Sequence, residues 1–121
     1  MMIRRAVFEE VGLLDQNIFM YGEDIEFCMR AKFHHWDIGV HPTAKVTHFG
    51  SSSSSSKNAI IGELKSYVYI WAKHKPTWQL PLVKLLLKIG VMLRIVLFGT
   101  IVHDRHRAAI YKEALQVLKT T

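Results

Sequence analysis

An apolar segment of about 23 residues, the length of a membrane-spanning helix, places the strongest constraint on how this chain folds. It runs from Leu80 to Val102, and Lys84, Lys88 and Arg94 interrupt it. At about 100° per residue, the three cations share roughly one third of a helix circumference. Each central cation costs about 2.5–3.5 kcal/mol in a spanning helix, which favours a helix lying in the membrane interface. The alternative is a helix packed on a neighbouring domain, with long lysine side chains at its rim.

Length, charge and cysteine content narrow the class of protein further. The chain has 121 residues, enough for one small domain, and 16 Lys and Arg against 10 Asp and Glu give a net charge of +6. The basic residues concentrate from Lys57 onward, in the more apolar half, so we expect an anionic membrane surface and no nucleic acid as partner. Cys28 is the only cysteine, which excludes an internal disulfide and favours a cytoplasmic setting. The first residues carry no secretory signal.

Hydrophobic spacing and helix-end signals predict several helices and two short strands. Apolar residues three and four apart, with Gly12 after the first helix and Asp104 capping the last, indicate helices over 4–11, 23–33, 58–74 and 105–119. Alternating side chains around a turn at 41–43 predict strands over 37–40 and 44–49. The serine run 51–56 predicts a loop.

The second predicted helix begins with an acidic pair in a recognisable setting. Glu23 and Asp24 follow Gly22, and Arg30 comes six residues after Asp24. With the aromatic residues before the pair and the histidine that ends the second predicted strand, this stretch resembles the acceptor-side half of family 2 glycosyltransferases of the GT-A fold, near their rhamnosyltransferase-like branch. The resemblance covers roughly residues 3–57.

The resemblance implies that Asp24 is the general base of an inverting, single-displacement sugar transfer. A carboxylate on a rigid element can take the acceptor proton, and a helix N-terminus favours its negative charge. The alternative is that Glu23 and Asp24 only cap the helix. By the same resemblance Glu23, Tyr21 and Arg30 are expected to bind the acceptor.

Two further sites are expected after the second predicted strand. The resemblance implies that His48 completes a site for a divalent cation, Mg²⁺ or Mn²⁺, whose other ligands lie in a preceding donor half. Gly50, Ser51 and Lys57 are expected to meet the donor diphosphate in a closing loop, and a plain linker is the alternative.

The resemblance therefore implies an α/β fold: a partial GT-A, Rossmann-like domain with two short strands and helices over 1–57, then a mainly helical tail over 58–121. The donor-binding strand–helix–strand unit and the Asp-x-Asp motif do not occur in this sequence. We expect this chain to be the C-terminal part of a transferase that moves a sugar from a nucleotide-sugar to a glycan or glycolipid acceptor in cell-surface polysaccharide or glycolipid synthesis. We expect the enzyme to act at the inner face of the cell membrane, and this chain to be inactive by itself. The alternative is a non-catalytic remnant that binds a membrane or a partner.

Overall fold

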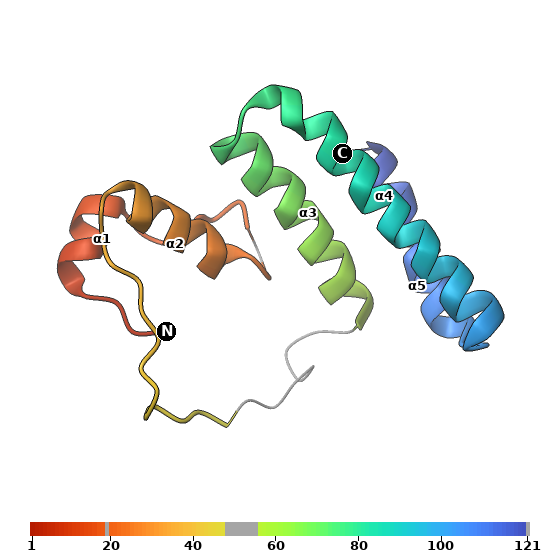
Figure 1. Cartoon of the computed structure of the whole chain (residues 1–121), viewed down its shortest axis with the longest axis horizontal. Helices are drawn as coiled ribbons and strands as arrows, with labels where there is room; N and C mark the ends of the chain where they lie inside the picture. The colour runs from red at the N-terminus through yellow and green to blue at the C-terminus, as the bar shows by residue number, and fades with distance from the viewer. Residues whose placement is uncertain (19, 48–55, 121) are drawn as a thin grey trace.

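The computed structural model describes residues 1–18, 20–47 and 56–120, and these residues form five α-helices and two short helical segments. The elements are α1 Arg5–Val11, α2 Glu23–Phe33, α3 Ser56–His74, the 3₁₀ turn η1 Thr77–Gln79, α4 Leu80–Val96, the π-helical segment η2 Leu97–Ile101 and α5 Arg105–Thr120. Figure 1 shows α1 and α2 together at one end of the molecule, with α3 between them and the α4–α5 pair. The helices predicted over 4–11, 23–33, 58–74 and 105–119 are therefore confirmed, with ends shifted by at most two residues, whereas the helix predicted over 80–102 is α-helical only to Val96.

A small apolar core joins α1 to α2. Val7 packs against Phe27 and Ala31, and the rings of Phe8 and Phe27 lie 5.4 Å apart. Gly12 ends α1 with a φ of +86°, a left-handed conformation that glycine adopts readily, and its N–H donates to the carbonyl of Phe8. The predicted stop at Gly12 is confirmed, and the chain turns there toward α2.

A second core holds α3, α4 and α5 together. Val68, Val91 and Leu118 are buried at its centre, one from each helix. α4 and α5 run side by side (Figure 1), joined through η2 and a short turn. The carboxylate of Asp104 accepts a hydrogen bond of 2.9 Å from the backbone N–H of Arg107, which confirms the predicted cap of the last helix.

The prediction of an α/β fold is wrong. The described part of the chain contains no strand, and residues 37–47, where both predicted strands begin, form no β-ladder. Their apolar side chains are exposed, with Val40 94% accessible. An extended segment becomes a strand only when a neighbour pairs its backbone groups, and none of the described residues does so. The partial GT-A, Rossmann-like domain is therefore not what these residues form, and the end of the second predicted strand, 48–49, lies outside the described residues.

No helix in the described ranges has both the length and the apolarity needed to cross a bilayer. The 80–102 segment is instead divided into α4 and η2, followed by a turn.

Candidate functional site

The acidic pair at the start of α2 is presented by a left-handed turn. Tyr21 has a φ of +66° and Gly22 a φ of +104°. A non-glycine residue in this region is unfavourable by about 1–2 kcal/mol, so Tyr21 needs support from its surroundings. The sequence prediction that Glu23 starts the helix is confirmed, and the turn decides the direction in which Glu23 and Asp24 leave it.

Helix α3 supplies this support through close backbone contact. A Cβ atom on Gly22 would lie 3.1 Å from the Cβ of Ser66 and 3.2 Å from the Cδ1 of Ile70. A Cβ atom on Gly62 would lie 3.2 Å from the carbonyl oxygen of Met20. Both glycines therefore allow the turn to lie directly on α3, and the position of the acidic pair depends on a helix that follows it by more than thirty residues.

Asp24 lies open to solvent at the N-terminus of α2. Its Oδ1 accepts a hydrogen bond of 2.8 Å from the backbone N–H of Ile25. The side chain borders a shallow hollow of about 370 Å³. The other residues that line the hollow are Ile25, Cys28, Met29, Lys32 and Ile38. The carboxylate is therefore accessible from the hollow, and the surface around it is apolar with one cation.

Glu23 lies deeper than Asp24. Its Oε2 is buried and has no hydrogen-bond partner within the described residues. A buried carboxylate oxygen without a donor is unfavourable, and Glu23 does not line the Asp24 hollow.

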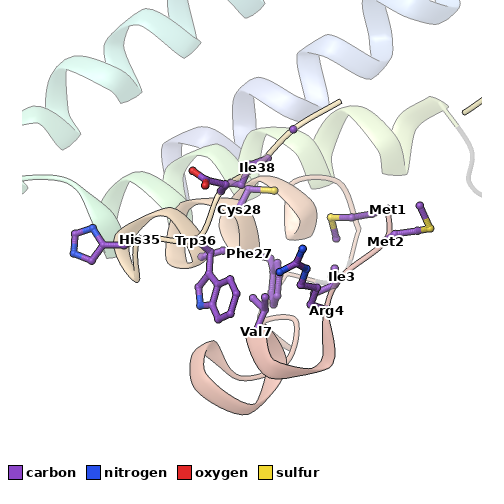
Figure 2. Close-up of a pocket in the computed structure, with 13 residues that line it drawn as sticks. Met1, Met2, Ile3, Arg4, Val7, Phe27, Cys28, His35, Trp36 and Ile38 are labelled. Carbon is purple, nitrogen blue, oxygen red and sulfur yellow. The ribbon is translucent and has the colours of Figure 1, made fainter. Parts of the chain in front are cut away.

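A larger pocket of about 540 Å³ adjoins the Asp24 hollow and lies between α1, α2 and the segment 35–39 (Figure 2). Val7, Phe27 and Trp36 supply apolar surface, and Arg4 contributes a cation. Cys28 and Ile38 line both spaces and so lie on their common border. The two spaces together offer an extended, mostly apolar surface that begins at Asp24.

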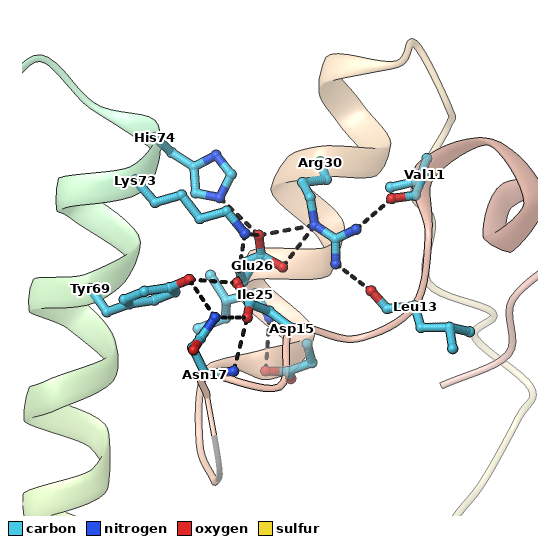
Figure 3. A network of polar contacts seen from close by, with 11 residues as sticks. Val11, Leu13, Asp15, Asn17, Ile25, Glu26, Arg30, Tyr69, Lys73 and His74 are labelled. Atoms are coloured by element: carbon cyan, nitrogen blue, oxygen red, sulfur yellow. Dashed lines mark hydrogen bonds and ion pairs between the residues drawn. The ribbon is translucent and has the colours of Figure 1, made fainter.

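Arg30 lies on the side of α2 that faces the end of α1 and the loop after it (Figure 3). Its Nε lies 2.9 Å from both carboxylate oxygens of Glu26, and its two terminal nitrogens donate to the carbonyl oxygens of Val11 at 2.6 Å and Leu13 at 2.7 Å. Arg30 thus fixes the loop after α1 against α2. Its guanidinium faces these groups, and its predicted contact with an acceptor stays a prediction.

Glu26 is the centre of the polar network in Figure 3 and has no exposed side-chain surface. Besides Arg30, the Nζ of Lys73 donates to it at 2.7 Å and the Nε2 of His74 lies 3.0 Å from it. Burial raises the pKa of Glu26, but the hydrogen bonds from Lys73, Arg30 and His74 outweigh burial and hold that pKa below its usual value of 4.5. Glu26 is therefore a charged anchor between α2 and the end of α3.

Lys73 joins this anchor to the loop before α2. Its Nζ lies 2.6 Å from the Oδ2 of Asp15, which also accepts a hydrogen bond of 2.8 Å from the hydroxyl of Tyr69. The hydrogen bond from Lys73, followed by that from the backbone N–H of Asn17, holds the pKa of Asp15 well below its usual range. Burial lowers the pKa of Lys73, but its bonds to Asp15 and Glu26 raise it more, so the net shift is upward.

Of the remaining predicted site residues, the structure describes only Lys57, which it does not bring together with Asp24. His48, Gly50 and Ser51 lie outside the described residues. Lys57 lies at the start of α3 and forms an ion pair with Glu113 of α5. Across the described residues, no group of three or more His, Cys, Asp or Glu side chains could hold a metal ion.

The sequence analysis missed the ionic network around Glu26. One part of it was readable, because Glu26 and Arg30 are four residues apart, the spacing at which helical side chains pair. The contacts of Glu26 and Asp15 with Lys73 join residues 47 and 58 positions apart, and nothing in the local sequence indicates them.

Sequence comparison with known proteins finds two kinds of relative. The chain is 31% identical over 85 residues, 68% of its length, to N-acetylglucosaminyl-diphospho-decaprenol L-rhamnosyltransferase of Mycobacterium tuberculosis, and 51% identical over 39 residues, 32% of its length, to a low-salt glycan biosynthesis hexosyltransferase of Haloferax volcanii. The chain is a relative of glycosyltransferases. It spans 28% and 13% of the length of these two glycosyltransferases. No protein-family profile and no solved structure matches it.

Proposed function

We propose that this glycosyltransferase relative carries the acceptor side of an inverting family 2 enzyme, which transfers a sugar from a nucleotide-sugar to an acceptor hydroxyl in cell-surface polysaccharide or glycolipid synthesis. The observation that carries the proposal is the position of Asp24: an accessible carboxylate at a helix N-terminus, presented by a left-handed turn and opening on a hollow. The names of the two relatives support the reaction class.

In this proposal Asp24 acts as the general base. It accepts the proton of the acceptor hydroxyl as that oxygen attacks the anomeric carbon and the nucleoside diphosphate leaves. Positioned bases of this kind contribute about 10²–10⁴-fold to rate. Glu23, the neighbour of Asp24 in the first turn of α2, is proposed to orient the acceptor.

The acceptor is proposed to be a glycolipid with a diphosphate. The Mycobacterium relative is named for a diphospho-decaprenol substrate, and the surface beside Asp24 suits such a molecule. Lys32 borders the hollow and offers a cation to a phosphate, while Cys28 and Ile38 continue the apolar surface into the pocket of Figure 2. A divalent cation, Mg²⁺ or Mn²⁺, stays a proposal, and no step is assigned to it because the described residues do not themselves assemble a metal site.

We also propose that the chain divides after residue 57 into a catalytic part and a helical tail. The enzyme is proposed to act at the inner face of the membrane. The contacts of α3 with the turn and with Glu26 give one physical reason to treat residues 58–74 as part of the support for the base.

Substitution of Asp24 by Asn in the active full-length protein that contains this chain tests the base. We expect turnover with saturating donor and acceptor to fall by about 100-fold or more, with donor affinity unchanged, because the amide cannot accept the proton. The matched control is Glu9→Gln, which removes an exposed carboxylate of α1 outside the hollow. Unchanged turnover in the Asn variant would refute the assignment.

A further inference from the structure

Helix α4 presents an apolar face on the side opposite its packed core. Val91 and its neighbours face α3 and α5, whereas residues at the intervening positions are exposed. We call the exposed set the outward face of α4: Leu82, Leu85, Leu86, Ile89, Met92, Leu93 and Val96. At 1.5 Å per residue this face is about 21 Å long. Trp78 and Ile101, beyond the two ends of the helix, are also exposed.

Cations border this face on both sides. On one side Lys84 and Lys88 line a shallow hollow together with Leu85 of the outward face. On the other side Arg94 lines the groove that α4 forms with α3 and α5, together with Leu86. From residue 64 to residue 103 the sequence contains six Lys and Arg and no Asp or Glu. The face is therefore apolar at its centre with three cations along its edges, and the groove of Arg94 also contains Glu63 of α3.

This distribution of charge distinguishes two candidate partners for the outward face: a second copy of the chain and a lipid bilayer. If the outward faces of two copies packed together, the three cations along each face would approach those of the other copy, and Glu63 is the only acidic residue among the described residues that line the two adjoining hollows. A bilayer with anionic lipids suits both the apolar centre and the cationic edges of the face, because the leucines enter the acyl region while the cations remain among the phosphates. Tryptophan at a helix end is typical of such an interface, and Trp78 is 72% exposed.

We propose that the outward face of α4 docks on an anionic lipid bilayer, with the helix axis parallel to the membrane plane. The proposal rests on this face alone and does not depend on the assignment of Asp24. α3 lies between α4 and the turn that carries the acidic pair, so the docked molecule would hold the site at a fixed distance from the membrane.

Flotation of the full 121-residue chain with vesicles tests the proposal. We expect binding to vesicles of phosphatidylcholine with phosphatidylglycerol, and weaker binding to phosphatidylcholine alone. Leu86→Ser combined with Leu93→Ser should lower the partition coefficient by on the order of tenfold or more, because two half-exposed leucines no longer enter the lipid. Lys88→Gln combined with Arg94→Gln should lower it by roughly 30-fold on the anionic vesicles only, at about 1 kcal/mol for each cation.

Matched variants separate docking from loss of structure. Leu86→Met combined with Leu93→Met keeps the apolar surface and should retain binding. Phe33→Ser removes an even more exposed apolar side chain, from α2, and should also retain binding. Circular dichroism checks that each variant is folded.

Three results would overturn the proposal: no binding to either kind of vesicle, equal binding of the double Ser variant, or self-association in analytical ultracentrifugation that the double Ser variant abolishes. The last result would assign the face to contact between copies. Because no sugar is involved, failure here leaves the transferase proposal standing, and failure of the Asp24 test leaves docking standing.

Discussion

Replacing Lys73 with Met tests whether the end of α3 anchors the helix that carries the acidic pair. The Nζ of Lys73 lies 2.6 Å from Asp15 and 2.7 Å from Glu26, and these carboxylates are 8% and 0% exposed. Methionine keeps much of the apolar stem and removes the charge. Loss of one partner from a fully buried pair costs about 3–5 kcal/mol, and from an exposed pair less than about 1 kcal/mol. Lys73 is 34% exposed and Glu26 keeps two other partners, so we expect a loss of about 2 kcal/mol.

Urea unfolding at pH 7, followed by circular dichroism, measures this loss. With a denaturant slope of about 2 kcal/mol per molar, the midpoint should fall by roughly 1 M. Lys65→Met makes the same chemical change at an exposed position of α3 and should change stability by less than about 0.5 kcal/mol. Equal midpoints for the Lys73 variant and the wild type would contradict the anchor.

The pH dependence gives an independent check. The pKa values of Asp15 and Glu26 are lowered in the folded state, so their contribution is present above the unfolded pKa values and is lost as the pH falls through the folded ones. The usual values are 3.8 and 4.5, so the loss begins near these values. The raised pKa of Lys73 contributes stability that is fully present below its usual value of 10.5 and is lost only as the pH rises above that value, so this contribution does not vary in the acidic range. The difference between wild type and variant should therefore narrow between about pH 5 and pH 3, and a constant difference would show that the ion pairs do not cause it.

Two further substitutions test how α2 is held against α3 and against the loop after α1. Arg30→Lys keeps the charge but loses the planar group that reaches the carbonyl oxygens of Val11 and Leu13, so the free energy of unfolding should fall by about 1–3 kcal/mol, and an unchanged urea midpoint would contradict this. Gly22→Ala introduces a Cβ 3.1 Å from Ser66 at a φ of +104°, so a loss of about 2 kcal/mol should lower the melting temperature by several degrees in a calorimeter, and a melting temperature equal to that of the wild type would refute the contact.

The sequence by itself determined where the helices lie and most of their ends, although not the end of α4 at Val96. Gly12 after α1, the acidic residues that open α2 and Asp104 before α5 act through contacts within one or two turns, so their effects are readable locally. The position of Asp24 at a helix start was therefore predictable. Its function as a base is not settled by that position and stays a prediction.

Only the tertiary structure decided what lies around those helices. The alternating residues near Val40 look like a strand, but a strand needs a partner that the local pattern cannot supply, and the segment remains unpaired. The contact of Gly22 with α3 and the bonds of Lys73 to Asp15 and Glu26 join residues more than forty positions apart. Such contacts depend on how the helices pack, because the residues next to each partner in the sequence do not indicate which distant residue it will contact. The sequence therefore placed the acidic pair on a helix, and packing against α3 determined how that pair is held.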